Sequence, residues 1–514
     1  MRWAGLVVAL MLHPTPAVTA APSITSLLPA AAKPGTTTLV TLRGENLAGA
    51  TELWTSFPAA VARVAEADPV QFKLTLPTQT SVGVGAVRLI TTNGMSGLML
   101  ILVDTLPASS SHGTNHSLAT AQRIANPGAV DGNCEGLLSD FFRFTARKGE
   151  RASIEAVAQR LGSPLDPWIR VLDSQGRELA FNDDISGLGV DARIEFRCPT
   201  SGDYCVEIRD TRHAGGAQHR YRLRLGPPLP VPLSFLSSPD LARFTSVMEA
   251  TPVAAEREPN DDISRAQFVQ TPVEVAGRFA RDGDRDVYEF QANKGERWVF
   301  RGQTRSLGSP CDLLMRLEST NGMKIAEANA TSSDDGALTN RFPEGGTYRV
   351  ILEELNRGGG SNFLYRLAIR PFVPGFTLST ETERISAPAG EDFTIEVRAE
   401  RRDYDGPIEF GVVDSTGHIQ MTNARMSGKT NVARITLKSA EELPLGGCVP
   451  FSLTGSARVL DSTVTERVST LPALRNAFPS MMHPPRQFDG LIHFSVAESK
   501  SSSPGPSGKK KKRK

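Results

Sequence analysis

The sequence predicts an all-β protein made of tandem β-sandwiches joined by linkers. Short segments of alternating apolar and polar residues recur along the chain, as in residues 38–42 and 393–398. The 45 glycines and 35 prolines supply the turns that many short strands require. The central segments lack the 3.6-residue period of an amphipathic helix. A chain of 514 residues is also too long for one ordinary domain, and its length corresponds to roughly three to five.

Residues 1–20 have the pattern of a secretory signal peptide. Arg2 precedes the apolar residues 4–12, and Val18-Thr19-Ala20 supplies a cleavage site. The apolar stretch is too short to cross a bilayer, which takes about 20 residues. The alternative is an apolar first strand. We expect a protein that is secreted, periplasmic or on the cell surface, with no membrane span.

Residues 21–105 contain the first group of predicted strands. Three short motifs mark it, namely Pro22-Ser23-Ile24, Leu42-Arg43-Gly44-Glu45-Asn46-Leu47 and Thr92-Asn93-Gly94. On these motifs the segment resembles the IPT/TIG family of immunoglobulin-like domains. The resemblance implies an Ig-like sandwich.

The central part of the chain repeats itself. The motif at residues 147–151, Arg-Lys-Gly-Glu-Arg, recurs at residues 293–297 as Asn-Lys-Gly-Glu-Arg. A repeat unit this long indicates tandem globular domains and not a short-repeat solenoid. We therefore expect one β-sandwich in residues 106–226, a Pro-rich linker in residues 227–255, and a second sandwich in residues 256–371.

The C-terminal part alternates again, and residues 372–497 predict a fourth, Ig-like sandwich. Residues 498–514 are rich in Ser, Pro and Gly and end in six basic residues, which indicates a disordered tail. Two interpretations of this basic tail stand. It contacts an anionic polymer outside the cell, or it only adds solubility.

Charge and motif content exclude several classes of function. Lys and Arg number 57 against 56 Asp and Glu, which argues against a general nucleic-acid binder. No H-E-x-x-H, G-x-S-x-G or P-loop motif occurs, so we expect no enzyme. The scattered cysteines form no C-x-x-C motif, which argues against a zinc ribbon or a thioredoxin-like site. They are Cys134, Cys198, Cys205, Cys311 and Cys448.

The pairing of these cysteines is left open by the sequence. Cys198 and Cys205 flank the turn at residues 199–202. They either face each other across a hairpin as a disulfide or stay apart, because geometry decides the matter.

Two acidic clusters, residues 256–262 and 282–286, lie at the start of the segment 256–371. Clustered carboxylates repel one another unless a cation or water screens them. Calcium takes six to eight oxygen ligands, and alternate side chains of an extended segment project to one side. Glu256, Glu258 and Asn260 can therefore face one ion together. The alternative is a solvated acidic loop.

Both central segments resemble the bacterial pre-peptidase C-terminal (PPC) domain. The motifs that carry the resemblance are Glu258-Pro259-Asn260-Asp261, Asp286-Val287-Tyr288-Glu289-Phe290, Lys294-Gly295-Glu296 and Gly346-Thr347-Tyr348-Arg349-Val350. The resemblance implies jelly-roll sandwiches of the kind appended to secreted proteases. It also implies calcium binding, since related collagen-binding domains use such a linker with Asp residues before the Tyr-x-Phe strand. The implied ligands are Glu256, Glu258, Asn260, Asp261, Asp286 and Asp284, with Asp282 as the alternative to Asp284.

The segment 106–226 departs from this pattern. Its lead-in is Gly113-Thr114-Asn115-His116-Ser117, in which Asn115 lies near the position of Asn260 and His116 replaces Asp261. A calcium site of the same kind is weakly supported there. The tyrosines recur at matched strand positions, as core residues of sandwiches do, so a collagen-like binding face is not supported.

These observations favour a secreted, non-catalytic protein with an adhesion, scaffold or substrate-targeting role. Its expected partner is an extracellular polymer or protein, with no specific nucleic acid. The alternative is an exported, protease-associated hydrolase or an accessory subunit of one. The sequence leaves the oligomeric state open.

Overall fold

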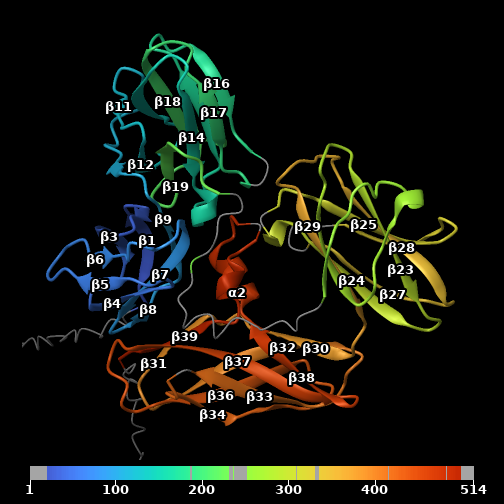
Figure 1. Cartoon of the computed structure of the whole chain (residues 1–514). Helices are drawn as coiled ribbons and strands as arrows, with labels where there is room; N and C mark the ends of the chain where they lie inside the picture. The colour runs from blue at the N-terminus through green and yellow to red at the C-terminus, as the bar shows by residue number, and fades with distance from the viewer. Residues whose placement is uncertain are drawn as a thin grey trace, which may run out of the picture.

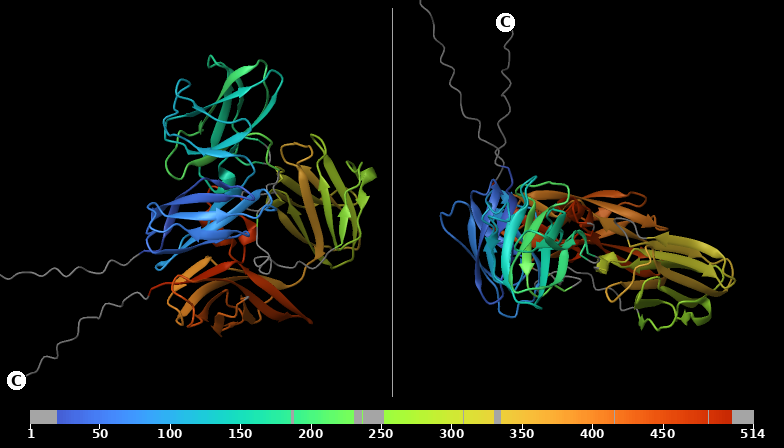
Figure 2. Two further views of the ribbon diagram at one scale, coloured as in Figure 1. Left: turned by 60° about the vertical axis from the view of Figure 1, so that its left-hand side comes forward. Right: turned by 90° about the horizontal axis from the view of Figure 1, so that it is seen from above.

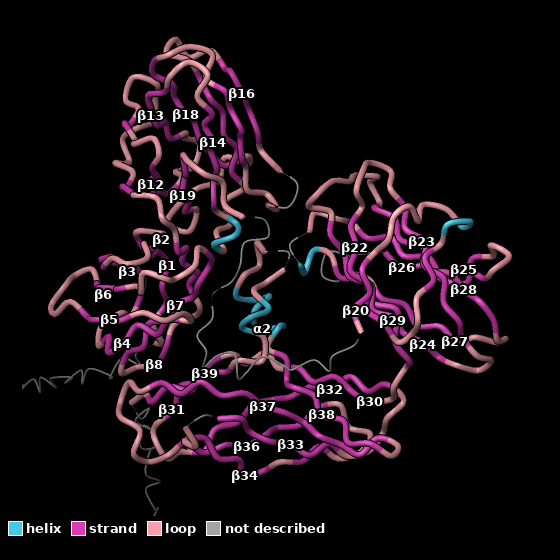
Figure 3. The backbone as a smooth tube through the Cα atoms, viewed as in Figure 1, coloured by secondary structure: helices cyan, strands magenta, loops and turns pink. Residues whose placement is uncertain are grey.

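The computed structural model describes residues 20–185, 188–230, 236, 252–307, 309–329, 335–414, 416–481 and 483–498. The chain has 52% strand and 4% helix, which confirms the all-β class (Figure 3). The expected signal segment 1–20 and basic tail 498–514 lie outside the described residues, apart from residues 20 and 498.

The strands gather into four bodies, named sandwiches 1 to 4 in chain order (Figures 1 and 2). Sandwich 1 packs a sheet of order β1-β3-β6-β5 against one of order β2-β9-β7-β4, to which β8 is added. Its strands are β1 (Ser23–Leu28), β2 (Ala31–Ala32), β3 (Thr37–Glu45), β4 (Ala50–Thr55), β5 (Ala60–Arg63), β6 (Gln71–Thr75), β7 (Gly83–Thr91), β8 (Gly94–Met95) and β9 (Met99–Val103).

Sandwich 2 consists of two five-stranded sheets, β10-β12-β19-β14-β17 and β11-β13-β18-β15-β16. Its strands are β10 (Ala108–Ser110), β11 (Gln122–Arg123), β12 (Gly128–Asn133), β13 (Asp140–Ala146), β14 (Arg151–Val157), β15 (Pro167–Leu172), β16 (Glu178–Asn182), β17 (Arg193–Arg197), β18 (Gly202–Asp210) and β19 (Arg220–Leu225). A 3-10 turn, η1 (Gln159–Leu161), follows β14.

Sandwich 3 has the same strand order, β20-β22-β29-β24-β27 and β21-β23-β28-β25-β26. Its strands are β20 (Val253–Ala255), β21 (Gln267–Phe268), β22 (Val273–Arg278), β23 (Arg285–Ala292), β24 (Arg297–Gln303), β25 (Leu313–Ser319), β26 (Lys324–Asn329), β27 (Ala337–Arg341), β28 (Gly346–Glu354) and β29 (Leu364–Pro371). Two 3-10 turns, η2 (Ile263–Arg265) and η3 (Arg305–Leu307), lie between strands.

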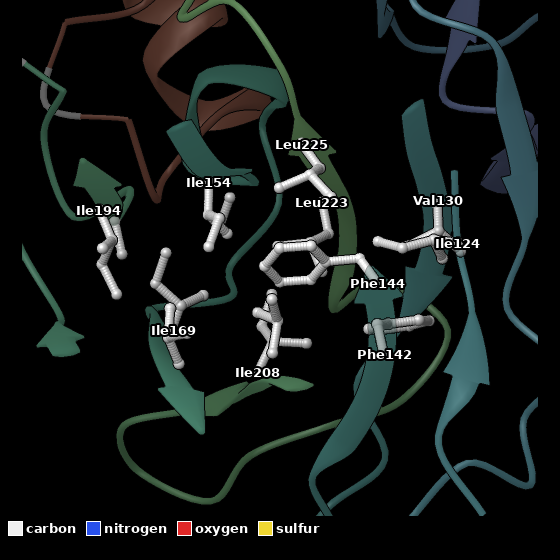
Figure 4. Packing of buried hydrophobic residues seen from close by; sticks show 14 of the residues in the cluster. Ile124, Val130, Phe142, Phe144, Ile154, Ile169, Ile194, Ile208, Leu223 and Leu225 are labelled. Carbon is white, nitrogen blue, oxygen red and sulfur yellow. The ribbon is translucent and has the colours of Figure 1, made fainter. Parts of the chain in front are cut away.

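The cores of sandwiches 2 and 3 follow from the alternation of their strands. In β13, Phe142 and Phe144 are fully buried, while Arg143 between them is half-buried on the outer face. Figure 4 shows Phe142, Phe144, Ile154, Ile169 and Leu223 meeting between the two sheets. Because side chains of a strand alternate between faces, each sheet supplies one apolar face to this core.

Sandwich 4 differs from a sandwich of two separate sheets. Its ten strands form one hydrogen-bonded sheet around a single core, because β38 pairs with β30 in parallel and joins the two halves. The strands are β30 (Gly375–Ser379), β31 (Arg384–Ala387), β32 (Asp392–Arg402), β33 (Ile408–Asp414), β34 (Ile419–Asn423), β35 (Arg425–Met426), β36 (Val432–Ser439), β37 (Cys448–Val459), β38 (Ser462–Ser469) and β39 (Ile492–Val496).

A short helix, α2 (Leu471–Ala477), and the turn η4 (Arg486–Phe488) interrupt the strands of sandwich 4. The sequence analysis predicts no helix here, because seven residues are too few to display a helical period. Leu474 and Phe478, four residues apart, lie on one face of the helix. Figure 1 places α2 at the centre of the molecule, between the other bodies.

The residues around α2 form an apolar cluster that we call the joint. It unites sandwiches 1, 2 and 4 with Leu229, a residue of the expected linker. The buried members are Ala30, Ala31, Val84, Ala86, Leu100, Leu102, Val157, Leu161, Leu229, Leu474, Phe478, Phe488 and Leu491. The start of the expected linker is therefore part of a packed interface. No helix within the described ranges has the length and apolar character of a membrane span.

The joint predicts a test of how the sandwiches hold together. Phe478→Ala removes a side chain that is 4% exposed, so we expect the free energy of unfolding to fall by about 3–5 kcal/mol. Denaturant unfolding of the full chain measures this. Leu460→Ala is the control, because Leu460 is 76% exposed and its loss should change little. Equal unfolding curves for the Phe478 variant and the wild-type chain would contradict the proposed joint.

The structure decides between the two alternatives for Cys198 and Cys205, because no disulfide joins them. All five cysteines, each in the described part of the chain, are free thiols. Cys198 follows β17 and points into the core, whereas Cys205 lies on β18, in the other sheet, between the core residues Tyr204 and Val206. The two side chains therefore belong to different sheets and different faces.

Candidate metal centre

The predicted ligands come from two segments of sandwich 3. Residues 256–262 form the lead-in between β20 and η2, and residues 279–284 form the turn before β23. The parallel pairing of β21 with β23 and a bond from the Val287 amide to the Asn260 carbonyl (3.0 Å) bring the two segments together. Asp262 ends the lead-in by accepting a bond from the Ser264 amide (2.8 Å), as an N-cap does.

The carboxylates meet in two overlapping triplets. Glu256, Glu258 and Asp286 form one, and Glu258, Asp261 and Asp284 form the other. Within each triplet, one oxygen from each residue lies within 4.8 Å of the others. Glu258 belongs to both triplets and is their shared centre.

Asn260 completes the set. Its side chain is fully buried, and one terminal atom of its amide lies 3.1 Å from Glu258 Oε2 and 3.0 Å from Asp286 Oδ1. With its nitrogen inward, the amide donates to both carboxylates. With its oxygen inward, it offers a further hard ligand to a cation between them.

Asp284, in the turn, and Asp286, in β23, each carry a carboxylate oxygen without a hydrogen-bond partner among the described residues. Asp286 is fully buried and Asp284 is 4% exposed. Asp286 Oδ2 and Asp284 Oδ1 accept no hydrogen bond from any described residue. A buried, unpartnered charge is strongly unfavourable, so these oxygens call for a proton or a cation.

The titration of the cluster reflects this lack of a counter-charge. Burial, with the negative charge of Glu256 nearby, raises the pKa of Asp286 to about 9. Burial also raises the pKa of Asp284 and that of Glu258. Each of the three groups therefore holds its proton more tightly than an isolated carboxyl group does.

Three side chains outside the predicted set position the cluster. The Tyr365 hydroxyl donates to Glu256 Oε1 (2.9 Å) and lies 2.5 Å from the Tyr288 hydroxyl, so two buried tyrosines orient Glu256. Arg281 Nη2 donates to Asp261 Oδ1 (2.5 Å) and lies 3.7 Å from Asp284 Oδ1. Arg281 therefore screens one triplet and leaves the other without a cation.

The structure brings together all six predicted residues, namely Glu256, Glu258, Asn260, Asp261, Asp284 and Asp286. Asp282, the alternative, is exposed and belongs to neither triplet. Tyr288 and Tyr365 lie at strand positions typical of core residues, and no sequence pattern indicates the contacts of their hydroxyl groups. Arg281 was also missed, because nothing in its neighbourhood distinguishes a partner of Asp261 from a solvated arginine.

The donor set suits calcium on chemical grounds. Carboxylate and amide oxygens are hard ligands, and no histidine or cysteine takes part. Calcium–oxygen distances of about 2.3–2.6 Å place opposite ligands roughly 4.6–5.2 Å apart, so oxygens that lie within 4.8 Å of one another can share one calcium ion. Magnesium, at about 2.0–2.1 Å, requires a tighter shell.

No known family profile matches the chain. A stretch of 70 residues is 36% identical to a probable subtilase-type serine protease of Deinococcus radiodurans, and it covers 13% of this chain and 9% of the protease. The chain thus spans less than a tenth of the length of this curated relative.

Two solved structures show weak likenesses. The pre-peptidase C-terminal domain of a collagenase from Bacillus anthracis matches at 15% identity and a TM-score of 0.17, over 20% of this chain and 93% of that domain. The protein SGBP-B of a Bacteroides ovatus mixed-linkage glucan utilization locus matches at 12% identity and a TM-score of 0.16, over 67% of this chain and 73% of that one. At these values the likenesses place the chain in no family, and the candidate site rests on its own geometry.

Proposed function

We propose that the chain is an exported, non-catalytic β-sandwich protein that holds calcium at the lead-in of sandwich 3. The observation that carries the metal site is a pair of buried carboxylate oxygens, one on Asp284 and one on Asp286, that lie among further carboxylates and accept no hydrogen bond from the described residues. Bound calcium would join the lead-in to the turn before β23.

The role outside the cell is a scaffold, adhesion or substrate-targeting role. The central joint supports a scaffold, because a packed apolar cluster holds three sandwiches in one arrangement. The extracellular partner is a polymer or a protein. A second candidate is an accessory module of an exported hydrolase, favoured by the 70-residue likeness to a serine protease.

A calcium titration tests the metal site. We expect full-length chain, stripped of metal and titrated by calorimetry, to bind one or two calcium ions and to bind magnesium more weakly. Glu258→Gln should abolish the binding, since Glu258 belongs to both triplets. Glu441→Gln is the matched control, because the Glu441 side chain is 81% exposed and pairs only with Lys438 among the described residues. Equal calcium binding by Glu258→Gln and wild-type chain would refute the site.

A further inference from the structure

The lead-ins of sandwiches 2 and 3 correspond position by position. The Val287 amide donates to the Asn260 carbonyl (3.0 Å), and the Phe141 amide donates to the Asn115 carbonyl (2.7 Å). The Glu256 amide bonds to the Ala276 carbonyl as the Ser111 amide bonds to the Asp131 carbonyl. Sandwich 2 thus places Ser111, Gly113, Asn115, His116 and Asp140 where sandwich 3 has Glu256, Glu258, Asn260, Asp261 and Asp286.

A buried tyrosine marks the same point in both sandwiches. Tyr221 and Tyr365 are fully buried at equivalent places on β19 and β29. The Tyr221 hydroxyl lies against Gly132, and the Tyr365 hydroxyl lies against Gly277. A Cβ atom added to either glycine would lie only 2.5 Å or 2.4 Å, respectively, from the hydroxyl oxygen, so both positions need glycine. In sandwich 2 the Tyr221 hydroxyl donates to Asp140 Oδ2 (2.5 Å).

The two equivalent sites differ in charge. Sandwich 3 gathers five carboxylates, with Arg281 at one side. In sandwich 2 only Asp140 remains, because Ser111, Gly113, His116 and Leu138 take the other acidic positions. One buried carboxylate therefore faces one imidazole.

The surroundings of His116 determine its protonation. Nδ1 lies 3.2 Å from Asp140 Oδ1 and 3.2 Å from the Ser139 carbonyl, and Nε2 lies 3.1 Å from the Gly113 carbonyl. All three neighbours are acceptors. A neutral imidazole has one nitrogen lone pair, which would face an acceptor here, so both nitrogens donate only if the ring is an imidazolium.

We infer that protonated His116 is the resident cation of sandwich 2 and stands where sandwich 3 is built for calcium. The ion pair between protonated His116 and Asp140 holds the lead-in of sandwich 2 in place, and this lead-in binds no metal. The comparison with calcium rests on the proposed function, whereas the charge of His116 rests on its own contacts.

Other ionisable groups lie close enough to the His116–Asp140 pair to affect its electrostatics. Burial raises the pKa of Asp140, and Glu135 adds to that effect. Cys134 and Tyr221 also border Asp140, and burial raises the pKa of each. Asp210 lies next to Cys134. His116 is the group of opposite charge that pairs with Asp140.

Nuclear magnetic resonance of the full chain with 15N-labelled histidine rings tests the charge. At pH 6 we expect both ring nitrogens of His116 to carry protons, in chelator and in calcium alike. His116→Gln assigns these signals by removing them. A neutral ring at pH 6, with one unprotonated nitrogen, would overturn the inference.

Melting of the full chain supplies a second readout. His116→Gln should melt about 4 °C below the wild-type chain at pH 6, and the gap should close by pH 9, because the ion pair with Asp140 requires the ring proton. His112→Gln, on the same lead-in, should show no such pH-dependent gap. A gap that is the same at both values of pH would mean that His116 acts only through packing, and would overturn the inference.

The two proposals fail separately. If wild-type chain takes up no calcium while His116 carries two protons, the metal site falls and the histidine assignment stands. If Glu258→Gln abolishes all calcium binding, sandwich 2 holds no metal, as inferred. Calcium that remains in this variant and disappears in Asp140→Asn would place metal in sandwich 2 and overturn the inference.

Discussion

Asp286→Asn should change the stability of the chain in opposite directions with and without calcium. In chelator at pH 8, the variant removes a buried carboxyl group whose Oδ2 has no partner, so we expect a melting temperature roughly 5–10 °C above the wild type. In calcium the same variant lacks a ligand and should melt below the wild type. Calorimetry of both chains in both buffers measures the crossing.

The size of the calcium effect follows from linkage. At one hundred times the dissociation constant, bound calcium stabilises the wild type by about 2.7 kcal/mol, which corresponds to roughly 10 °C for a domain of this size. The variant should lose this response. Melting temperatures of the wild type that agree in calcium and in chelator would contradict the prediction.

Asp140→Asn is the matched control, since Asp140 occupies the equivalent place in sandwich 2. Its carboxylate has partners, the Tyr221 hydroxyl and His116, so the variant should lower stability equally in both buffers. Only Asp286, whose Oδ2 lacks a hydrogen-bond partner among the described residues, should give a crossing.

The pH dependence has a definite sign. The pKa of Asp286 is raised to about 9 in the folded, metal-free chain, so folding favours its protonated form. Its contribution to stability is fully present below the usual carboxyl range and is lost as the pH rises towards 9. Stabilisation by calcium should therefore grow from pH 5 to pH 9, because the ion takes the place of the proton.

Glu383→Gln should destabilise the contact between sandwiches 1 and 4 by about 3–5 kcal/mol. Glu383 pairs with Arg88, and the two side chains are 8% and 1% exposed. The variant leaves the Arg88 guanidinium buried without its carboxylate, although Nη1 still donates to the Ser96 carbonyl (2.9 Å). Burial, with Arg384 nearby, already lowers the pKa of Arg88 to about 9.

A double-mutant cycle separates the pair from its surroundings. Arg88→Met together with Glu383→Met should recover most of the loss, since no buried charge remains. Glu396→Gln is the control, because its pair with Arg398 is largely exposed and should contribute less than about 1 kcal/mol. A loss for Glu383→Gln as small as for this control would show that the pair does not hold the contact.

The sequence predicted the grouping of the acidic residues better than it predicted the contacts between sandwiches. Glu256, Glu258 and Asn260 lie in one extended segment, so their alternation alone places them on one side. Asp284 and Asp286 followed from the resemblance of the segment to a known motif. By contrast, Arg88 and Glu383 are 295 residues apart. The sequence around each of them does not distinguish it from an ordinary charged residue on the surface.

The sequence by itself determined the all-β class and the acidic residues of the lead-in, because strand alternation and local charge density are read from neighbouring residues. The tertiary structure alone decided which thiols are apart, which arginines are buried, and that α2 unites three sandwiches. Those outcomes depend on which sheet faces approach one another, and this approach depends on packing between segments hundreds of residues apart. The same holds for the surroundings of His116, where the fold gathers the Asp140 carboxylate and two carbonyls.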